Sequence, residues 1–111
     1  MDNVKDNNYY LKKIVKDLGF LIAHTSGISK EKLEQDEVLQ DCIMFRLIQV
    51  SENSVRLTED FKLRYSEVPW QAIKGMRNRI VHEYGNVDLA IVFDTVTKDV
   101  PKLYEALAQL I

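Results

Sequence analysis

Apolar residues recur along most of the chain at intervals of three and four, the spacing that places them on one face of an α-helix. The first such run predicts a helix that ends at Gly27 and buries Leu11, Ile14, Val15, Leu18 and Ile22. A second run is about six turns long and has a second apolar flank, so we expect that helix to be sandwiched in the core or to lie at a subunit interface. Its members are Leu39, Ile43, Leu47, Val50, Ser54, Leu57 and Phe61, flanked by Met44, Ile48 and Val55.

The second half of the chain predicts two more long helices and a short one. Pro69 suits the first turn of a helix over 70–84, and Gly85 is its expected stop. Asp88 is then placed to cap a fourth helix, and Pro101 either kinks it or begins a last short helix. The pattern therefore predicts an all-α fold, a helical bundle of four long helices plus one short helix, with 1–111 as a single domain.

Composition agrees with this fold. The 111 residues suit one domain, and four glycines and two prolines are few for an all-β protein with many tight turns. Cys42 is the only cysteine. An internal disulfide and a cysteine-based metal cage are therefore excluded, and we expect Cys42 to be a small core residue on an apolar helix face.

Several classes of function are disfavoured by the sequence. The chain shows no signal peptide and no apolar run long enough to span a membrane, so we expect a cytoplasmic protein. The net charge of −2 argues against nonspecific coating of nucleic acid, and no helix has the basic face of a DNA-recognition helix. Neither argument excludes a nuclease with a local basic site.

The helix predicted over 70–84 carries an arginine in an unusual place. Arg77 and Tyr84 fall within its apolar sector, seven residues apart and nearly in line. A charged arginine in such a sector needs either a carboxylate partner, for which Glu52 is a candidate, or a cleft where an anion binds. The residue pattern leaves both explanations open.

A separate polar stripe on the same helix contains Gln71, Gly75, Asn78 and His82. Asn78 and His82 are four residues apart and are therefore neighbours on the helix surface. Gly75 leaves room for a partner helix or a ligand to come close. From spacing alone, a single histidine on a helix usually has no special role.

The segment from Arg77 through His82 to Tyr84 resembles the Arg-x4-His-x-Tyr signature of the HepT-like HEPN ribonuclease toxins. Asn78 fits the polar residue that commonly follows the arginine in HEPN nucleases. The resemblance begins near residue 7, reaches the end of the chain and is strongest over 69–103. Around Glu52 the match is only approximate, which leaves the role of that residue open.

This resemblance implies a HEPN-type helical bundle that forms a homodimer and places two Arg/His motifs around one cleft. It implies the toxin of a toxin–antitoxin system, an endoribonuclease that acts on RNA, in several members on tRNA, without a metal or another cofactor. It also implies a partner, an MntA-like nucleotidyltransferase antitoxin. That partner transfers AMP from ATP to the motif tyrosine, which is Tyr84 here, and silences the toxin.

The residues are compatible with cleavage of RNA by its own 2′-hydroxyl. That reaction needs a base, an acid and positive charge around the phosphate. His24, near the end of the first helix, has no polar cluster beside it and is expected to be structural or exposed. A twofold dimer that brings together His82 from both chains would supply base and acid, with Arg77 stabilising the phosphate charge and Asn78 orienting His82 or the phosphate.

Two questions stay open from the sequence. In an ideal helix Arg77 and His82 diverge by about 140°. The arginine side chain could curl around, the helix could distort near Gly85, or each Arg77 could serve the opposite protomer's His82.

The second question is the function itself, because a noncatalytic helical adaptor that binds a nucleotidyltransferase or a nucleotide is an alternative. A metal-dependent hydrolase is disfavoured, since no HExxH motif and no paired carboxylates at helical spacing accompany His82.

Overall fold

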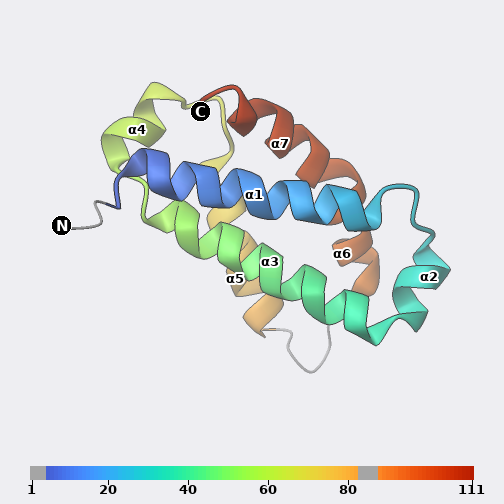
Figure 1. Ribbon diagram of the computed structural model, residues 1–111. Helices are drawn as coiled ribbons and strands as arrows, with labels where there is room; N and C mark the ends of the chain where they lie inside the picture. The colour runs from blue at the N-terminus through green and yellow to red at the C-terminus, as the bar shows by residue number, and fades with distance from the viewer. Residues whose placement is uncertain (1–4, 83–87) are drawn as a thin grey trace.

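The computed structural model describes residues 5–82 and 88–111, except for the side chains of Arg77, Ile80, Val81 and His82. Every regular element within these residues is helical (Figure 1). The short helices are α2 (Lys30–Gln35) and α4 (Glu59–Arg64). The long stretches are α1 (Asn7–Thr25), α3 (Glu37–Val55), α5 (Trp70–His82) and a continuous run of α6 (Leu89–Asp94), the π-helical turn η1 (Thr95–Asp99) and α7 (Val100–Ala108).

The predicted all-α bundle with four long helical stretches is thus confirmed. Side-chain caps fix where several helices begin, each accepting a hydrogen bond from a backbone N–H of the first turn. Gly27, the expected stop after α1, has a φ of 72°, a left-handed conformation that glycine adopts without strain. The capping residues are Asp6, Ser29, Asp36, Thr58 and, as the sequence predicts, Asp88.

The second apolar run does not form one uninterrupted helix. α3 ends at Val55, and Thr58 caps α4, which contains Phe61. Asn7, the first residue of α1, stabilises this break through two hydrogen bonds to Thr58. Its side-chain amide donates to Thr58 Oγ1 (3.0 Å), and its Oδ1 accepts from the Thr58 N–H (2.9 Å). The apolar spacing continues across the break because Leu57 is buried and Phe61 packs against the core.

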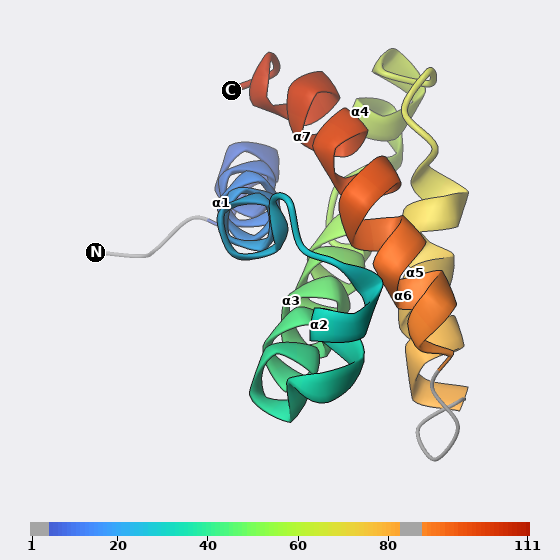
Figure 2. The same cartoon turned by 90° about the vertical axis from the view of Figure 1, so that its right-hand side faces the viewer.

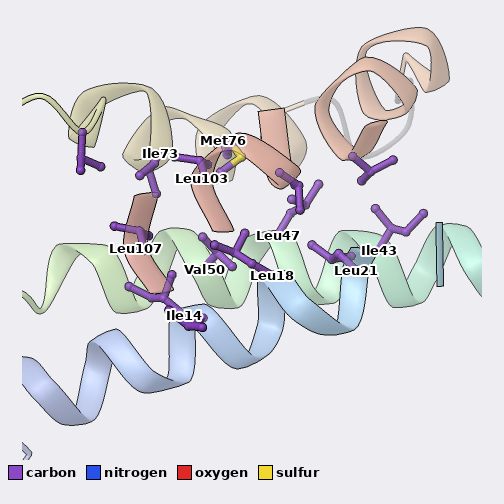
Figure 3. Packing of buried hydrophobic residues seen from close by; sticks show 14 of the residues in the cluster. Ile14, Leu18, Leu21, Ile43, Leu47, Val50, Ile73, Met76, Leu103 and Leu107 are labelled. Atoms are coloured by element: carbon purple, nitrogen blue, oxygen red, sulfur yellow. The ribbon is translucent and has the colours of Figure 1, made fainter. Parts of the chain in front are cut away.

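α3 lies between α1 and α5 and packs against both (Figure 2). α7 closes the bundle by packing against α1. The buried core is built from these helices, and Figure 3 shows their side chains meeting at the centre. The expected core face of α1 is confirmed, with Leu11, Ile14, Val15 and Leu18 buried and Ile22 partly buried.

Cys42 is not a core residue, contrary to the expectation from sequence. It is exposed on the outer side of α3. The reason is that α3 buries residues toward α1 and α5 but leaves a third side free. Val38 and Phe45 flank Cys42 there and are 75% and 58% exposed. Because apolar residues also occupy this outer side, the sequence pattern predicted burial there as well.

Pro101 begins a last short helix, as one of the two alternatives predicts, but no loop separates that helix from the one before. α7 starts at Val100, directly after the π-helical turn η1. The Val100 N–H donates to the carbonyl of Thr95, five residues back. A proline ring crowds the carbonyl four residues before it, and a wider turn directly upstream relieves that crowding while the chain stays helical.

None of the helices in the described ranges combines the length and the apolar composition that a membrane crossing requires.

Candidate active site on helix α5

The start of α5 is fixed by the segment that precedes it. The Ile73 N–H donates to the carbonyl of Pro69 (3.1 Å), so the proline stands at the helix entrance. The Trp70 indole N–H donates to the carbonyl of Tyr65 (3.0 Å), and Val68 is buried beside it. The predicted helix start at Pro69 is therefore confirmed, and the candidate site rests on a firmly held helix.

One side of α5 is attached to α3. Ile73 and Met76 are buried in the core, as the apolar sector predicts. The hydroxyl of Ser51, a fully buried residue of α3, donates to the carbonyl of Lys74 (2.9 Å). This bond joins the two helices one turn before Arg77.

The polar side of α5 is open in a single chain. Gln71, Asn78 and Arg79 are exposed, and Gly75 is half-buried. A methyl group placed on Gly75 would meet no described atom within 4 Å. The glycine therefore leaves the free space that the sequence predicts, and nothing within the described part of the chain fills it.

The structure places the backbones of Arg77, Asn78 and His82 on α5. The side chains of Arg77 and His82, and the whole of Tyr84 and Gly85, lie outside the described residues. α5 is α-helical from Trp70 to His82. Positions 77 and 82 are consequently about 140° apart around the helix axis within one chain.

Glu52 is half-buried on α3, and its pairing with Arg77 stays a prediction. His24 is exposed, in line with expectation, and its ring lies 4.2 Å from that of Phe20. Among the residues that the structure describes, no cluster of His, Cys, Asp and Glu side chains is arranged to hold a metal ion.

A groove that the sequence did not predict runs beside α5. It has a volume of about 630 Å³ and lies between α5 and α7. Ile73, Met76 and Leu103 form an apolar floor. Two cationic residues, Arg79 and Lys102, and two acidic residues, Glu67 and Asp99, also line the groove. A groove between helices of this size and composition can take a ligand or a partner chain. Sequence reasoning missed it because each helix pattern reveals its own buried face but not the space left between two helices.

The charge of α5 differs from that of the chain. α5 contains Lys74, Arg77 and Arg79 and no acidic residue, although the whole chain has a net charge of −2. A local positive field of this kind attracts phosphate groups. The helix thus combines positive charge, an exposed amide at Asn78 and a histidine, the residue type that most often transfers protons in catalysis.

These observations define the protein as an all-α helical bundle whose candidate site lies on a basic helix that carries a histidine. Residues 13–110 match the family described as "Ribonuclease HepT-like". The chain therefore belongs to the HepT-like ribonuclease family, and the resemblance seen in its sequence is confirmed. The enzyme class that the sequence predicts, a ribonuclease, is the class of this family.

Two relatives match over nearly their whole length. The chain is 33% identical to "Putative RNase TTE0752" of Caldanaerobacter subterraneus subsp. tengcongensis, over 92% of this chain and 91% of that protein. It is 30% identical to "Probable ribonuclease HepT" of Thermococcus cleftensis, over 85% of this chain and 86% of that protein. No solved structure gives a significant match to the chain.

Proposed function

We propose that the protein is the toxin of a toxin–antitoxin system, a metal-independent endoribonuclease that cuts RNA, foremost tRNA, at a site shared by two protomers. The observation that carries this proposal is the Arg77-x4-His82-x-Tyr84 motif of a HepT-like ribonuclease, with Arg77 and His82 on the basic helix α5. The exposed Asn78 and the open surface at Gly75 support it, because they leave this helix accessible.

The chemistry proceeds within the RNA. A base removes the proton of the 2′-hydroxyl, and that oxygen attacks the adjacent phosphorus. The bond from phosphorus to the 5′-oxygen breaks, and an acid returns a proton to the leaving oxygen. The products are a 2′,3′-cyclic phosphate and a 5′-hydroxyl end. One His82 acts as base and the other as acid, Arg77 balances the growing negative charge, and Asn78 orients His82 or the phosphate.

A twofold dimer through the polar side of α5 provides this arrangement. Gln71, Asn78 and Arg79 are exposed there, and Gly75 has open space above it. A second α5 packed on this side would bring both His82 residues to one cleft.

Inhibition by an MntA-like nucleotidyltransferase follows from the position of Tyr84. Tyr84 follows Arg77 by seven residues in the sequence, and AMP joined to its hydroxyl brings a phosphate to this end of the motif. The phosphate then pairs with Arg77 and occupies the place of the RNA phosphate.

The first experiment tests cleavage itself. The purified protein, free of AMP, is incubated with total tRNA in chelator beside His82→Ala and Arg77→Ala. We expect cleavage by the parent with cyclic-phosphate ends and a loss of about 100-fold or more in each variant. His24→Ala, which removes the other histidine, is the matched control and should cut normally. Absence of cleavage by the folded, AMP-free parent would contradict the proposal and favour the noncatalytic adaptor.

The second experiment tests the modified tyrosine. Tyr84→Phe removes only the hydroxyl that accepts AMP, so the antitoxin with ATP should fail to add AMP or to stop cleavage. Tyr65→Phe is the control and should be inhibited like the parent. Mass spectrometry of the treated protein measures AMP addition directly. Full inhibition of Tyr84→Phe with AMP on another residue would contradict the assignment.

A further inference from the structure

The outer side of α1 carries alternating cationic and aromatic side chains. From Tyr9 to Phe20 successive members are three or four residues apart, so they share one side of the helix, opposite the buried face, and Lys5 lies just before the helix begins. The lysines and Tyr9 are exposed, and Phe20 is half-buried. We call this set the basic–aromatic stripe; its members are Lys5, Tyr9, Lys13, Lys16 and Phe20.

Charge and aromatic rings are in direct contact along the stripe. The ammonium groups of Lys5 and Lys13 lie 5.8 Å and 5.6 Å from the centre of the Tyr9 ring. The only acidic residue of α1, Asp17, is bound to Arg46 of α3 at 2.7 Å. The carboxylate is therefore already compensated by Arg46 and does not cancel the charge of the lysines.

A hollow of about 410 Å³ lies beside the stripe, between α1 and α3. Tyr9, Lys13, Lys16 and the paired Asp17 line it from α1, and Phe45, Arg46 and Gln49 line it from α3. Phe45 is 58% exposed, although a phenylalanine gains from burial. An exposed ring beside two cations and an amide provides a stacking surface, phosphate ligands and a hydrogen-bonding group in one place.

We propose that the stripe and this hollow bind the RNA substrate as a second contact surface, away from the cleavage site. The lysines bind phosphates, and Tyr9 and Phe45 stack on unpaired bases. An acidic protein would also satisfy the lysines, but stacking faces beside the cations favour nucleic acid. This inference rests on the proposed function, because the RNA is taken to be the same substrate.

Because the stripe lies away from α5, an RNA must be long to contact both the stripe and the cleavage site. α1 lies across α3 from α5, so the two surfaces are on different sides of the chain (Figure 2). The protomer measures 44 × 32 × 27 Å. Only an RNA that extends around the protomer can contact both surfaces, whereas a short oligonucleotide contacts the cleavage site alone.

The charge test compares two double variants that each lose two positive charges. Lys13→Gln/Lys16→Gln changes the stripe, and Lys30→Gln/Lys98→Gln changes exposed lysines elsewhere. Binding is measured by fluorescence anisotropy with a 2′-O-methyl oligoribonucleotide of about 20 nucleotides, which cannot be cut. We expect the stripe variant to bind about tenfold more weakly and its log–log salt slope to shrink by about 1.4, while the control keeps the parent slope.

The stacking test uses Phe45→Leu, which keeps an apolar side chain without the ring. We expect about fivefold weaker binding of the same RNA. RNA that carries 5-iodouridine should crosslink on irradiation to Tyr9 or Phe45 in the parent. Circular dichroism and thermal unfolding confirm that each variant is folded. Lys13→Arg/Lys16→Arg keeps both positive charges and should bind the RNA like the parent.

The outcomes separate this inference from the proposed function. The stripe variant should raise KM for tRNA and leave cleavage of a short oligonucleotide of about four nucleotides unchanged. Parent-like RNA binding by the stripe variant and by Phe45→Leu would overturn the inference and leave the α5 mechanism standing. Weaker binding of the purified antitoxin, with RNA binding unchanged, would also overturn it and assign the stripe to a protein partner. Stripe-dependent RNA binding without cleavage would overturn only the proposed function.

Discussion

Asp36 stands between α2 and α3 and serves both helices. Its carboxylate accepts from the Leu39 N–H at 3.0 Å, and it lies 3.2 Å from the ammonium group of Lys32. The hydrogen bond from the Leu39 backbone N–H, followed by the one from the Lys32 side chain, holds the pKa of Asp36 below its usual 3.8. The folded protein therefore favours the charged carboxylate more than the unfolded chain does.

The sign of the pH dependence follows from this lowered pKa. Stability from Asp36 is fully present above the unfolded-state pKa and is lost as the pH falls through the lower folded-state pKa. We expect Asp36→Asn, which keeps a capping oxygen without the charge, to lose less stability than the parent between about pH 5 and pH 2. Urea unfolding at several pH values measures this. Asp41→Asn, an exposed residue of α3, is the control, and an equal effect there would refute the role of the cap.

Local residue chemistry was the most predictable part of the molecule. The cap at Asp88 and the stop at Gly27 depend only on neighbours in sequence, and both are confirmed. Cys42 was misplaced because the apolar pattern of α3 does not show which of its sides other helices cover. The Arg46 guanidinium carbon lies 3.8 Å from the centre of the Phe20 ring. This contact joins two different helices, so the local sequence gives no sign of it.

At the scale of elements, a hydrogen bond from Ser51 attaches α5 to α3 near the candidate site. Ser51→Ala removes the hydroxyl that bonds to the Lys74 carbonyl and should cost about 1 kcal/mol in free energy of unfolding. Because this bond lies one turn from Arg77, we also expect kcat to fall while KM for RNA changes little.

Ser54→Ala is the matched control for this change. Ser54 is also a buried serine of α3, but its hydroxyl donates to the Ser51 carbonyl within the same helix (2.7 Å). It should lower stability by a similar amount and leave kcat unchanged. Equal effects of both variants on kcat would show that Ser51 acts on stability alone. Urea unfolding and steady-state cleavage kinetics provide the two measurements.

The existence and order of the long helices followed from the apolar spacing, but the short helix α2 and two interruptions did not. The break between α3 and α4 depends on Asn7, which binds Thr58 across 51 positions of sequence. The π-helical turn before Pro101 keeps a helix continuous where a proline suggests an end or a kink. The sequence pattern alone indicates the motif residues on α5, and their role stays a prediction. The groove beside them could be recognised only from the packing of α5 against α7.

At the scale of the whole molecule, the proposal requires two histidines in one cleft. Dimers that combine one parent chain with one His82→Ala chain can be isolated by using two different affinity tags. If one His82 is the base and the other the acid, the mixed dimer should lose about 100-fold in cleavage rate. Two independent sites would instead leave half of the parent rate. A mixed dimer with one His24→Ala chain controls for tagging and subunit exchange.

The exposed position of Cys42 has a practical consequence for this question. The chain has no other cysteine, so a thiol-reactive spin label attaches at one known point on the outer side of α3. In a twofold assembly the two labels are related by the symmetry axis, and one interspin distance then reports how the protomers are oriented. The natural sequence thus already carries the probe for electron paramagnetic resonance of the assembly, with and without RNA, and no cysteine has to be introduced or removed.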